Sequence, residues 1–262
     1  MSSLTNQIAV VTGAGSGIGK AIAKELSTLG AHVYVTDINE ENALHVASEI
    51  KGEGYMATAY KLDVSNSTDV SDFFQKVNQL HERVDILVNN AGIAGTPSLI
   101  SNMTDEEWKK MLAIHVNGSF FCLREASKMM RKNRYGRVIN MSSLASETSL
   151  AGFAHYGAAK YAIVGLTEAA AKELAAYNVT VNAIKPGVIR SALTQGILSM
   201  AEERLSLATP NQKIGEPRDI AQVVAMLAKP ESSFVTGASI VVDGGFCLMN
   251  EMDRVVLEML EN

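Results

Sequence analysis

The sequence has few cysteines, few prolines and no long apolar run. Among its 262 residues are two cysteines, Cys122 and Cys247, and five prolines. Two isolated thiols form neither a disulfide framework nor a Cys-x-x-Cys metal site, so we expect them to be free and buried in a reducing compartment. The start, MSSLTNQIAVV, lacks the charge and apolar stretch of a secretory signal, and no run approaches the roughly 18 apolar residues of a membrane span. A cytoplasmic protein without a membrane partner is expected.

An excess of positive charge is also absent. The 23 Lys and Arg residues are outnumbered by 28 Asp and Glu, which gives a formal net charge of -5. Binding to nucleic-acid phosphates needs clustered cations, so a nucleic-acid partner is not expected and a small-molecule ligand fits better. The five histidines include no HExxH pair or similar ligand spacing, and we therefore predict no metal site.

Short apolar, β-branched runs alternate with longer helical patterns along the chain. Because these runs do not alternate cleanly with polar residues, they are typical of strands covered on both faces, and the segments between them are long enough for crossover helices. We predict an α/β fold with a doubly wound, seven-stranded parallel sheet and helices on both faces. The expected strands are residues 7–12, 32–36, 56–62, 84–89, 137–141, 179–184 and 238–242.

No repeat, low-complexity tract or proline-rich linker divides the chain, so residues 1–262 are expected to form a single domain. The irregular stretch 191–215 precedes a helix expected to start near Pro217, and segments placed like this often cover a ligand. The tail, about 246–262, carries apolar residues at helical spacing. It either packs on its own core or forms a subunit contact.

A glycine cluster follows the first expected strand. Gly13, Gly17 and Gly19 stand at a strand-to-helix turn, where glycine permits close backbone approach and free N–H groups attract a pyrophosphate. The second strand ends at Asp37, where a carboxylate accepts hydrogen bonds from an adenosine ribose. A P-loop is excluded, because the residue five before Gly19 is Ala14 and Lys20 is followed by Ala21.

Asp37 also bears on the choice between NAD and NADP. A carboxylate beside the ribose repels a 2′-phosphate, and the nearby Ser16 and Ile38 supply no cation. Two like charges about 4 Å apart repel by roughly 4 kcal/mol at an effective dielectric of about 20, although solvent reduces this value. We therefore predict NAD.

Tyr156 and Lys160 stand four residues apart in AHYGAAKYAIVGLTEAAAKEL, at the start of an expected helix. This spacing places both side chains on one helical face. Spacing alone leaves two interpretations open, a functional pair or two solvated surface residues.

Taken together, the ordered motifs closely resemble the short-chain dehydrogenase/reductase family in its length of about 250 residues. The resemblance covers nearly the whole chain. It rests on Thr12-Gly13-x3-Gly17-x-Gly19, Asp63-Val64, Asn89-Asn90-Ala91-Gly92, Asn117 within a long helix beginning near Asp105, Ser143, Tyr156-x3-Lys160, Pro186-Gly187 and Asp243-Gly244-Gly245.

The resemblance implies an enzyme with a Rossmann-like sheet, a nicotinamide cofactor, and metal-free interconversion of an alcohol and a carbonyl compound. It also implies a homo-oligomer, with a tetramer favoured over a dimer. The catalytic residues it implies are Asn117, Ser143, Tyr156 and Lys160, with Ser143 preferred to Ser142 by its spacing to the tyrosine. The cofactor-binding residues are Gly13, Ser16, Gly17, Ile18, Gly19, Asp37, Ile38, Asp63, Val64, Asn90, Ala91, Gly92, Tyr156, Lys160, Pro186, Gly187, Ile189 and Ser191.

The chemistry of the pair agrees with this role. Hydride transfer from an alcohol leaves a proton to be removed, and a free tyrosine with a pKa of about 10 is a poor base near neutral pH. A lysine ammonium about 4 Å away would favour the phenolate by roughly 4 kcal/mol, which corresponds to about three pKa units. We therefore expect the pKa of Tyr156 to be lowered to about 7.

The substrate pocket is expected to be mostly apolar. A partly hydrophobic secondary alcohol or ketone is the leading substrate class, with Ser143, Leu144, Ala145, Phe153 and His155 as wall residues. Glu147 and His155 leave a sugar or polyol open, or they form a solvated rim. The 3-oxoacyl-thioester reductases are a further alternative, but they usually carry Gly-Gln-x-Asn before the tyrosine and prefer NADPH. A catalytically idle NAD-sensing scaffold and a methyltransferase are the alternatives of other classes.

Overall fold

The computed structural model describes residues 4–261. Residues 1–3, at the start that was expected to lack a secretory signal, and residue 262, at the end of the expected tail, lie outside the described residues. The strands of the described chain form one seven-stranded parallel sheet, as predicted, and their order in the sheet is β3-β2-β1-β4-β5-β6-β7. Each expected strand is present, with its ends within two residues of the prediction. The strands are β1 (Ile8–Thr12), β2 (His32–Asp37), β3 (Ala57–Lys61), β4 (Ile86–Asn89), β5 (Gly136–Met141), β6 (Val179–Pro186) and β7 (Ser239–Val242).

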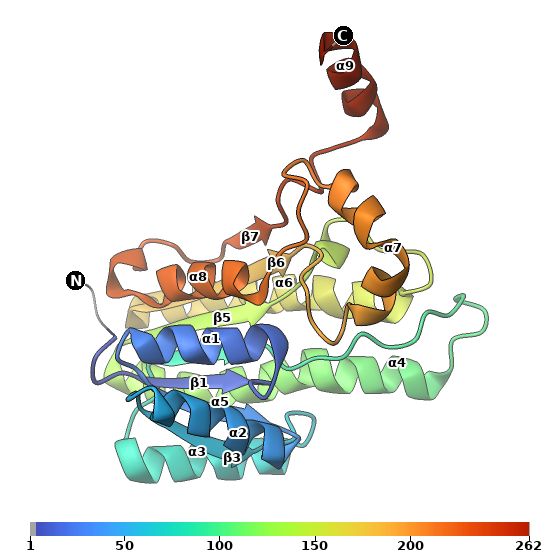
Figure 1. The fold of residues 1–262 in the computed structure, drawn as a ribbon. Coiled ribbons are helices and arrows are strands. Elements are labelled where there is room, and N and C mark those ends of the chain that lie inside the picture. Colours follow the sequence, from blue (N-terminus) through green and yellow to red (C-terminus); the bar gives the residue numbers. More distant parts are fainter. Residues whose placement is uncertain (1–3, 262) are drawn as a thin grey trace.

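Helices cover both faces of the sheet (Figure 1). Every residue of β1, β4, β5 and β6 is buried, which explains why these strands lack polar alternation. One apolar core lies beneath α1 (Gly17–Thr28), α2 (Glu40–Gly52) and α8 (Pro217–Ala228). The other lies beneath α3 (Ser67–His81), α5 (Gly118–Asn133) and α6 (Ala154–Leu174).

Local sequence signals set where several helices begin. Asn39 and Asn66 accept backbone N–H hydrogen bonds and so cap α2 and α3. Thr104 and Glu107 form a reciprocal capping box at the start of α4 (Asp105–Leu112). The helix predicted near Pro217 does begin there, with proline in its first turn.

The long helix predicted from Asp105 is interrupted by a π-helical segment. The helix α4 leads into η1 (Ala113–Asn117), a π-helix, and α5 follows directly. A π segment changes which side chains face inward, and such segments are frequent at functional sites. The short helices η2 (Leu144–Ser146), η3 (Ala175–Tyr177) and η4 (Pro230–Ser232) are 3-10 turns.

The predicted lid, 191–215, contains the helix α7 (Gln195–Ala208), which is kinked at Ala201. A β-bridge between Ile189 and Gly215 joins the two ends of this segment. Arg190 forms ion pairs with Glu202 and Glu216. The lid is therefore anchored at its base and runs over the sheet edge (Figure 1).

Two expectations about the carboxyl-terminal region are corrected. The helix α9 (Glu251–Glu261) stands away from the body in Figure 1, and Leu248 and Met259 are 83% and 74% exposed. The interpretation of the tail as packed on its own core is therefore wrong. Cys122 is buried, as expected. Cys247 is exposed, because it lies in the loop that leads from the body of the protein to α9.

In the described part of the chain, no helix has the length and apolar character needed to cross a membrane.

Candidate active site

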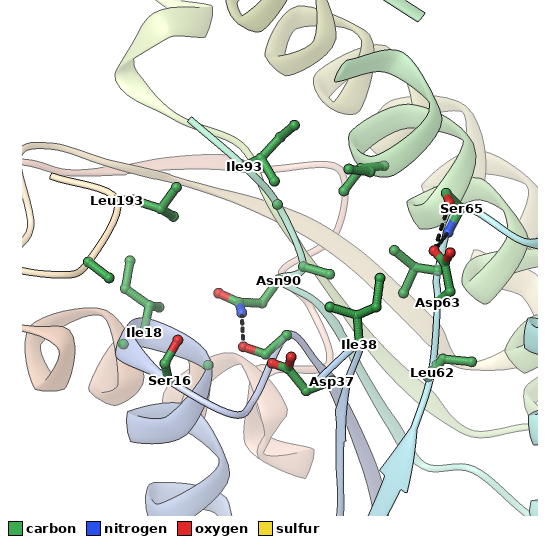
Figure 2. Close-up of a pocket in the computed structure, with 18 of the residues that line it drawn as sticks. Ser16, Ile18, Asp37, Ile38, Leu62, Asp63, Ser65, Asn90, Ile93 and Leu193 are labelled. Atoms are coloured by element: carbon green, nitrogen blue, oxygen red, sulfur yellow. Dashed lines mark hydrogen bonds between the residues drawn. The ribbon is translucent and has the colours of Figure 1, made fainter. Parts of the chain in front are cut away.

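The largest cavity described here, about 570 Å³, lies at the carboxyl ends of β1, β2, β3 and β4. In Figure 2 the turn into α1 carries Ser16 and Ile18 on one side, and Ile93 and Leu193 lie opposite. This is the edge where doubly wound sheets bind their ligands. The cavity is lined by thirteen of the predicted cofactor residues, namely Gly13, Ser16, Gly17, Ile18, Gly19, Asp37, Ile38, Asp63, Val64, Asn90, Ala91, Gly92 and Ser191.

Other lining residues were not assigned to the cofactor from the sequence. They come from the strand ends, from the helix α4 with its π segment, and from the lid, and they have no short motif of their own. They are Leu62, Ser65, Ile93, Lys110, Ala113, Ile114, Ala192 and Leu193.

The glycine turn is shaped for close backbone approach. Gly13 has a φ of +62°, and a Cβ atom there would lie 2.8 Å from Ala91 Cα. A Cβ atom on Gly19 would lie 2.2 Å from the carbonyl oxygen of Gly13. Ser16, the N-cap of α1, makes no side-chain capping hydrogen bond, so the first-turn N–H groups remain available to an anion.

Asp37 is held rigidly at the end of β2. Its Oδ2 accepts a hydrogen bond from the Gly15 backbone N–H at 3.0 Å, and its Oδ1 accepts one from the Asn39 N–H at 2.9 Å. Each oxygen keeps a second lone pair for a further donor. The carboxylate is therefore pre-positioned for a ribose diol.

The neighbouring strand ends are fixed in the same manner. Asp63 accepts hydrogen bonds from the Ser65 N–H and hydroxyl (Figure 2). Asn90 Nδ2 donates to the carbonyl oxygens of Thr12 and Gly13. Asn89 is buried instead, with Nδ2 donating to Asn140 Oδ1 at 2.8 Å. Asn89 therefore supports the sheet, whereas Asn90 faces the cavity.

Tyr156 and Lys160 are not two solvated surface residues. Lys160 is only 4% exposed, and its Nζ donates to the Met141 carbonyl oxygen at 2.8 Å. The same nitrogen lies 5.4 Å from the centre of the Tyr156 ring. The pair thus meets at the carboxyl end of β5.

The shifts in pKa differ from the expectation. Burial raises the pKa of Tyr156, and a hydrogen bond with Ser143 opposes this effect without reversing it. Burial lowers the pKa of Lys160 to about 7. The predicted lowering of the Tyr156 pKa by Lys160 is therefore wrong for the ligand-free chain, because removal from water disfavours both charged forms.

The geometry distinguishes the two adjacent serines. Ser142 is buried, and its hydroxyl donates to the Lys160 carbonyl oxygen at 2.9 Å. Ser143 is only partly buried, accepts a hydrogen bond from the Ala145 N–H, and interacts with Tyr156. Ser142 is structural, and Ser143 is the hydroxyl that remains beside the phenol.

Asn117, which was expected in the catalytic group, is not brought to the cavity. Asn117 is exposed at the end of the π-helix, and it does not line the cavity. Two positions along a helix turn a side chain toward nearly the opposite face. His115, two residues earlier, is buried beside Tyr156 instead. The sequence feature that could have indicated the burial of His115 is its position four residues after Met111, on the same face of the helix.

Several predicted residues lie outside the large cavity. Of the described residues, those that line this cavity do not include Tyr156, Lys160, Pro186, Gly187 or Ile189. Ile189 is a core residue that lines a separate cavity of about 170 Å³.

The predicted substrate wall is only partly accessible. Leu144 and Phe153 are partly exposed, but Ala145 and His155 are 3% and 1% exposed. His155 packs against Gly95 and Phe153, so it is not a rim residue. Glu147 is half-exposed and pairs with the buried Lys185.

The residues present fit a dinucleotide. A Cβ-free cradle and an uncapped helix start suit a pyrophosphate, and Asp37 suits a ribose.

Comparisons with known proteins agree with this geometry. The family model described as enoyl-(acyl carrier protein) reductase matches residues 13–247. The 3-oxoacyl-(acyl-carrier-protein) reductase FabG of Rickettsia bellii is 37% identical over 249 residues, which cover 95% of this chain and 100% of the relative. FabG of Thermotoga maritima is 35% identical, with 94% and 99% covered. A gluconate 5-dehydrogenase from Burkholderia cenocepacia, solved with NADP and tartrate, has a TM-score of 0.90 and 28% identity, with 95% and 98% covered.

The chain belongs to the short-chain dehydrogenase/reductase family.

Membership of the short-chain dehydrogenase/reductase family makes this protein an oxidoreductase that uses a nicotinamide dinucleotide and a small-molecule substrate. The family match ends at residue 247, so the exposed helix α9 lies beyond it.

Proposed function

We propose that the protein is an NAD(H)-dependent oxidoreductase that interconverts a secondary alcohol and a ketone, with Tyr156 as the general acid/base. The observation that carries this proposal is the buried Lys160 ammonium, which is fixed to Met141 and faces the Tyr156 ring beside Ser143. A scaffold that only sensed NAD would need the glycine turn and Asp37 but not this group.

The chain's own residues handle the substrate oxygen and its proton. A bound nicotinamide supplies the hydride acceptor for oxidation and the hydride donor for reduction. Ser143 hydrogen-bonds the substrate oxygen, and Tyr156 takes its proton in oxidation and returns it in reduction. Lys160, with a pKa of about 7, stabilises the phenolate when charged and contacts the ribose hydroxyls. The proposed contacts of Pro186, Gly187 and Ile189 are with the carboxamide.

We propose NAD as the preferred cofactor. The carboxylate of Asp37 is fixed by two backbone hydrogen bonds and cannot turn away freely from a 2′-phosphate. The adjacent Ser16 and Ile38 are neutral, and the cation among the lining residues, Lys110, comes from α4 rather than from the end of β2. The B. cenocepacia structure was solved with NADP, so the two cofactors must be compared directly.

The proposed substrate is a partly hydrophobic secondary alcohol or ketone. Leu193 lines the cavity, and Ile197 and Met200 are exposed on the lid. The names of the relatives favour a 3-oxoacyl thioester as the second candidate, and the gluconate 5-dehydrogenase favours a polyhydroxy acid. Glu147 lies four residues after Ser143, and Lys185 is next to Pro186. These two side chains form an ion pair, and this polar pair supports the polyhydroxy acid.

One experiment tests the reaction and the substrate together. Purified protein is mixed with NAD or NADP and a panel of secondary alcohols, polyols, hydroxysteroids and 3-hydroxyacyl thioesters, and NAD(P)H absorbance is followed. We expect turnover with NAD that falls about 10²–10⁴-fold in Tyr156→Phe. The variant should bind NADH with unchanged affinity. Normal NADH binding with near-wild-type turnover in Tyr156→Phe would make the proton-transfer assignment wrong.

We also propose a homo-oligomer, with a tetramer favoured. Val241 on the edge strand β7 is 40% exposed and Phe120 on α5 is 44% exposed. Light scattering on the purified protein gives the mass directly, and a monomer would refute the assembly.

A further inference from the structure

His115 occupies a central place that no catalytic motif predicted. It lies within the π-helix η1 and is 3% exposed, between the cavity wall and α6. The exposed Asn117, which ends the same π segment, points elsewhere. Within this π segment, the side chain that lies beside Tyr156 is therefore the imidazole of His115.

One edge of the His115 ring contacts the cofactor side of the site. Its Nε2 lies 3.0 Å from the Ile93 backbone nitrogen and 2.9 Å from the Ile93 carbonyl oxygen, so it bonds that residue in either tautomer. Ile93 lines the cavity. The ring also packs against Gly92, where a Cβ atom would lie 2.4 Å from Cε1. His115 thus fixes the backbone that follows β4.

The same ring contacts the proton-transfer group. The His115 and Tyr156 rings meet edge to face, with centroids 5.6 Å apart and an interplanar angle of 89°. Edge-to-face packing restricts the orientation of a phenol. A single side chain therefore joins the cavity wall to Tyr156.

The charge state of His115 suits a fixed structural link rather than a proton carrier. Burial and the charge on Lys160 are the main causes that lower the pKa of His115 to about 3, and His155 adds to them. Lys160 and His155 both belong to α6, which also carries Tyr156. The imidazole is therefore neutral at physiological pH and does not gain and lose a proton there.

We propose that His115, and not Asn117, is the positioning residue that holds Tyr156 in register with the bound cofactor. Its Nε2 fixes the position of the Ile93 backbone by a hydrogen bond, and its ring fixes the orientation of the Tyr156 phenol. This inference rests on the proposed function only for what Tyr156 does in the reaction.

The test separates the two contacts with two full-length variants. His115→Phe keeps an aromatic ring but loses the bond to Ile93, whereas His115→Gln keeps a polar group for Ile93 but loses the ring. His32→Phe serves as the matched control, because His32 stacks on Tyr34 away from the site. Two measurements need no turnover: NADH binding by fluorescence, and titration of Tyr156 by tyrosinate absorbance, as the difference from the same protein carrying Tyr156→Phe.

For His115→Phe we expect the Kd for NADH to rise about fivefold, as for one lost hydrogen bond, with the Tyr156 titration unchanged. For His115→Gln we expect a near-normal Kd but a shifted Tyr156 titration, and a kcat that falls about fivefold with little change in KM. His32→Phe should alter none of these values.

If both variants lower only Tm and leave the Kd and the titration at wild-type values, His115 is a core residue and the proposal fails. The reverse assignment, with the titration moved by His115→Phe alone, also overturns it. A protein that turns over no alcohol would refute the proposed function, yet both binding and titration results would still be measured.

Discussion

The two halves of the site hold their polar groups in different ways. The glycine-turn half (Gly13–Gly19, Asp37, Asp63 and Asn90) keeps its side chains near solvent and fixes them with hydrogen bonds to nearby backbone or side-chain groups. The proton-transfer half (His115, Ser143, Tyr156 and Lys160) includes buried ionisable groups with shifted pKa values. Local turns therefore build the first half, and removal from water sets the chemistry of the second.

The largest effect is expected in the proton-transfer half. Lys160→Met should lower kcat about 10²–10⁴-fold, because Tyr156 loses the buried lysine whose Nζ lies 5.4 Å from the centre of its ring. Steady-state kinetics with NAD measures this effect. Lys172→Met, an exposed lysine on the same helix, is the matched control. Retained turnover in Lys160→Met would contradict the division between the two halves.

Much of the glycine-turn half could be predicted from the sequence, because each of its parts is a short local signal. Glycines after a strand, an acid at the end of the next strand and an Asn pair at the end of another expected strand can be recognised without knowing the fold. Strand positions were equally predictable, since both faces of the central strands are buried and the apolar runs are continuous.

The remainder depends on tertiary packing and has no local signal. That Lys160 is buried follows from its contact with β5, nineteen residues away in sequence. The π turn decides that His115 faces Tyr156 while Asn117 faces outward, and helical periodicity from Asp105 does not reveal it. The exposed Cys247 and α9 depend likewise on where the chain leaves the body.

A second test changes the glycine-turn half. Asp37→Ser should reduce the NAD/NADP ratio of kcat/KM by about 10- to 100-fold, since the like-charge repulsion of a 2′-phosphate is removed but was partly screened by solvent. The serine hydroxyl can still accept one of the two backbone hydrogen bonds. Asp72→Ser removes the same charge from the exposed face of α3 and should leave the ratio unchanged. An unaltered ratio in Asp37→Ser would refute the NAD assignment.

A third test measures the burial of the proton-transfer half as stability. The pKa of His115 is about 3 in the folded protein, against 6.5 as its ordinary value. Between these values the unfolded chain binds more protons, so the free energy of unfolding falls as pH drops, by up to about 1.4 kcal/mol per pH unit from this group.

The pH dependence is read as a difference between two proteins. Wild type and His115→Phe are unfolded with urea from pH 7 to pH 4, and the wild type should lose more stability on acidification. Parallel curves would mean that His115 is not buried as a neutral group.

The smallest effect is expected for Asn117, which the family resemblance placed in the proton-transfer half. Because its side chain is exposed beyond the π turn, Asn117→Ala should change the free energy of unfolding by no more than about 0.5 kcal/mol, and kcat by about twofold at most. The variant is compared with His115→Gln in the same kinetic assay. A loss of kcat in Asn117→Ala that exceeds the loss in His115→Gln would restore the asparagine to the catalytic group and show that the π turn does not fix which side chain reaches Tyr156.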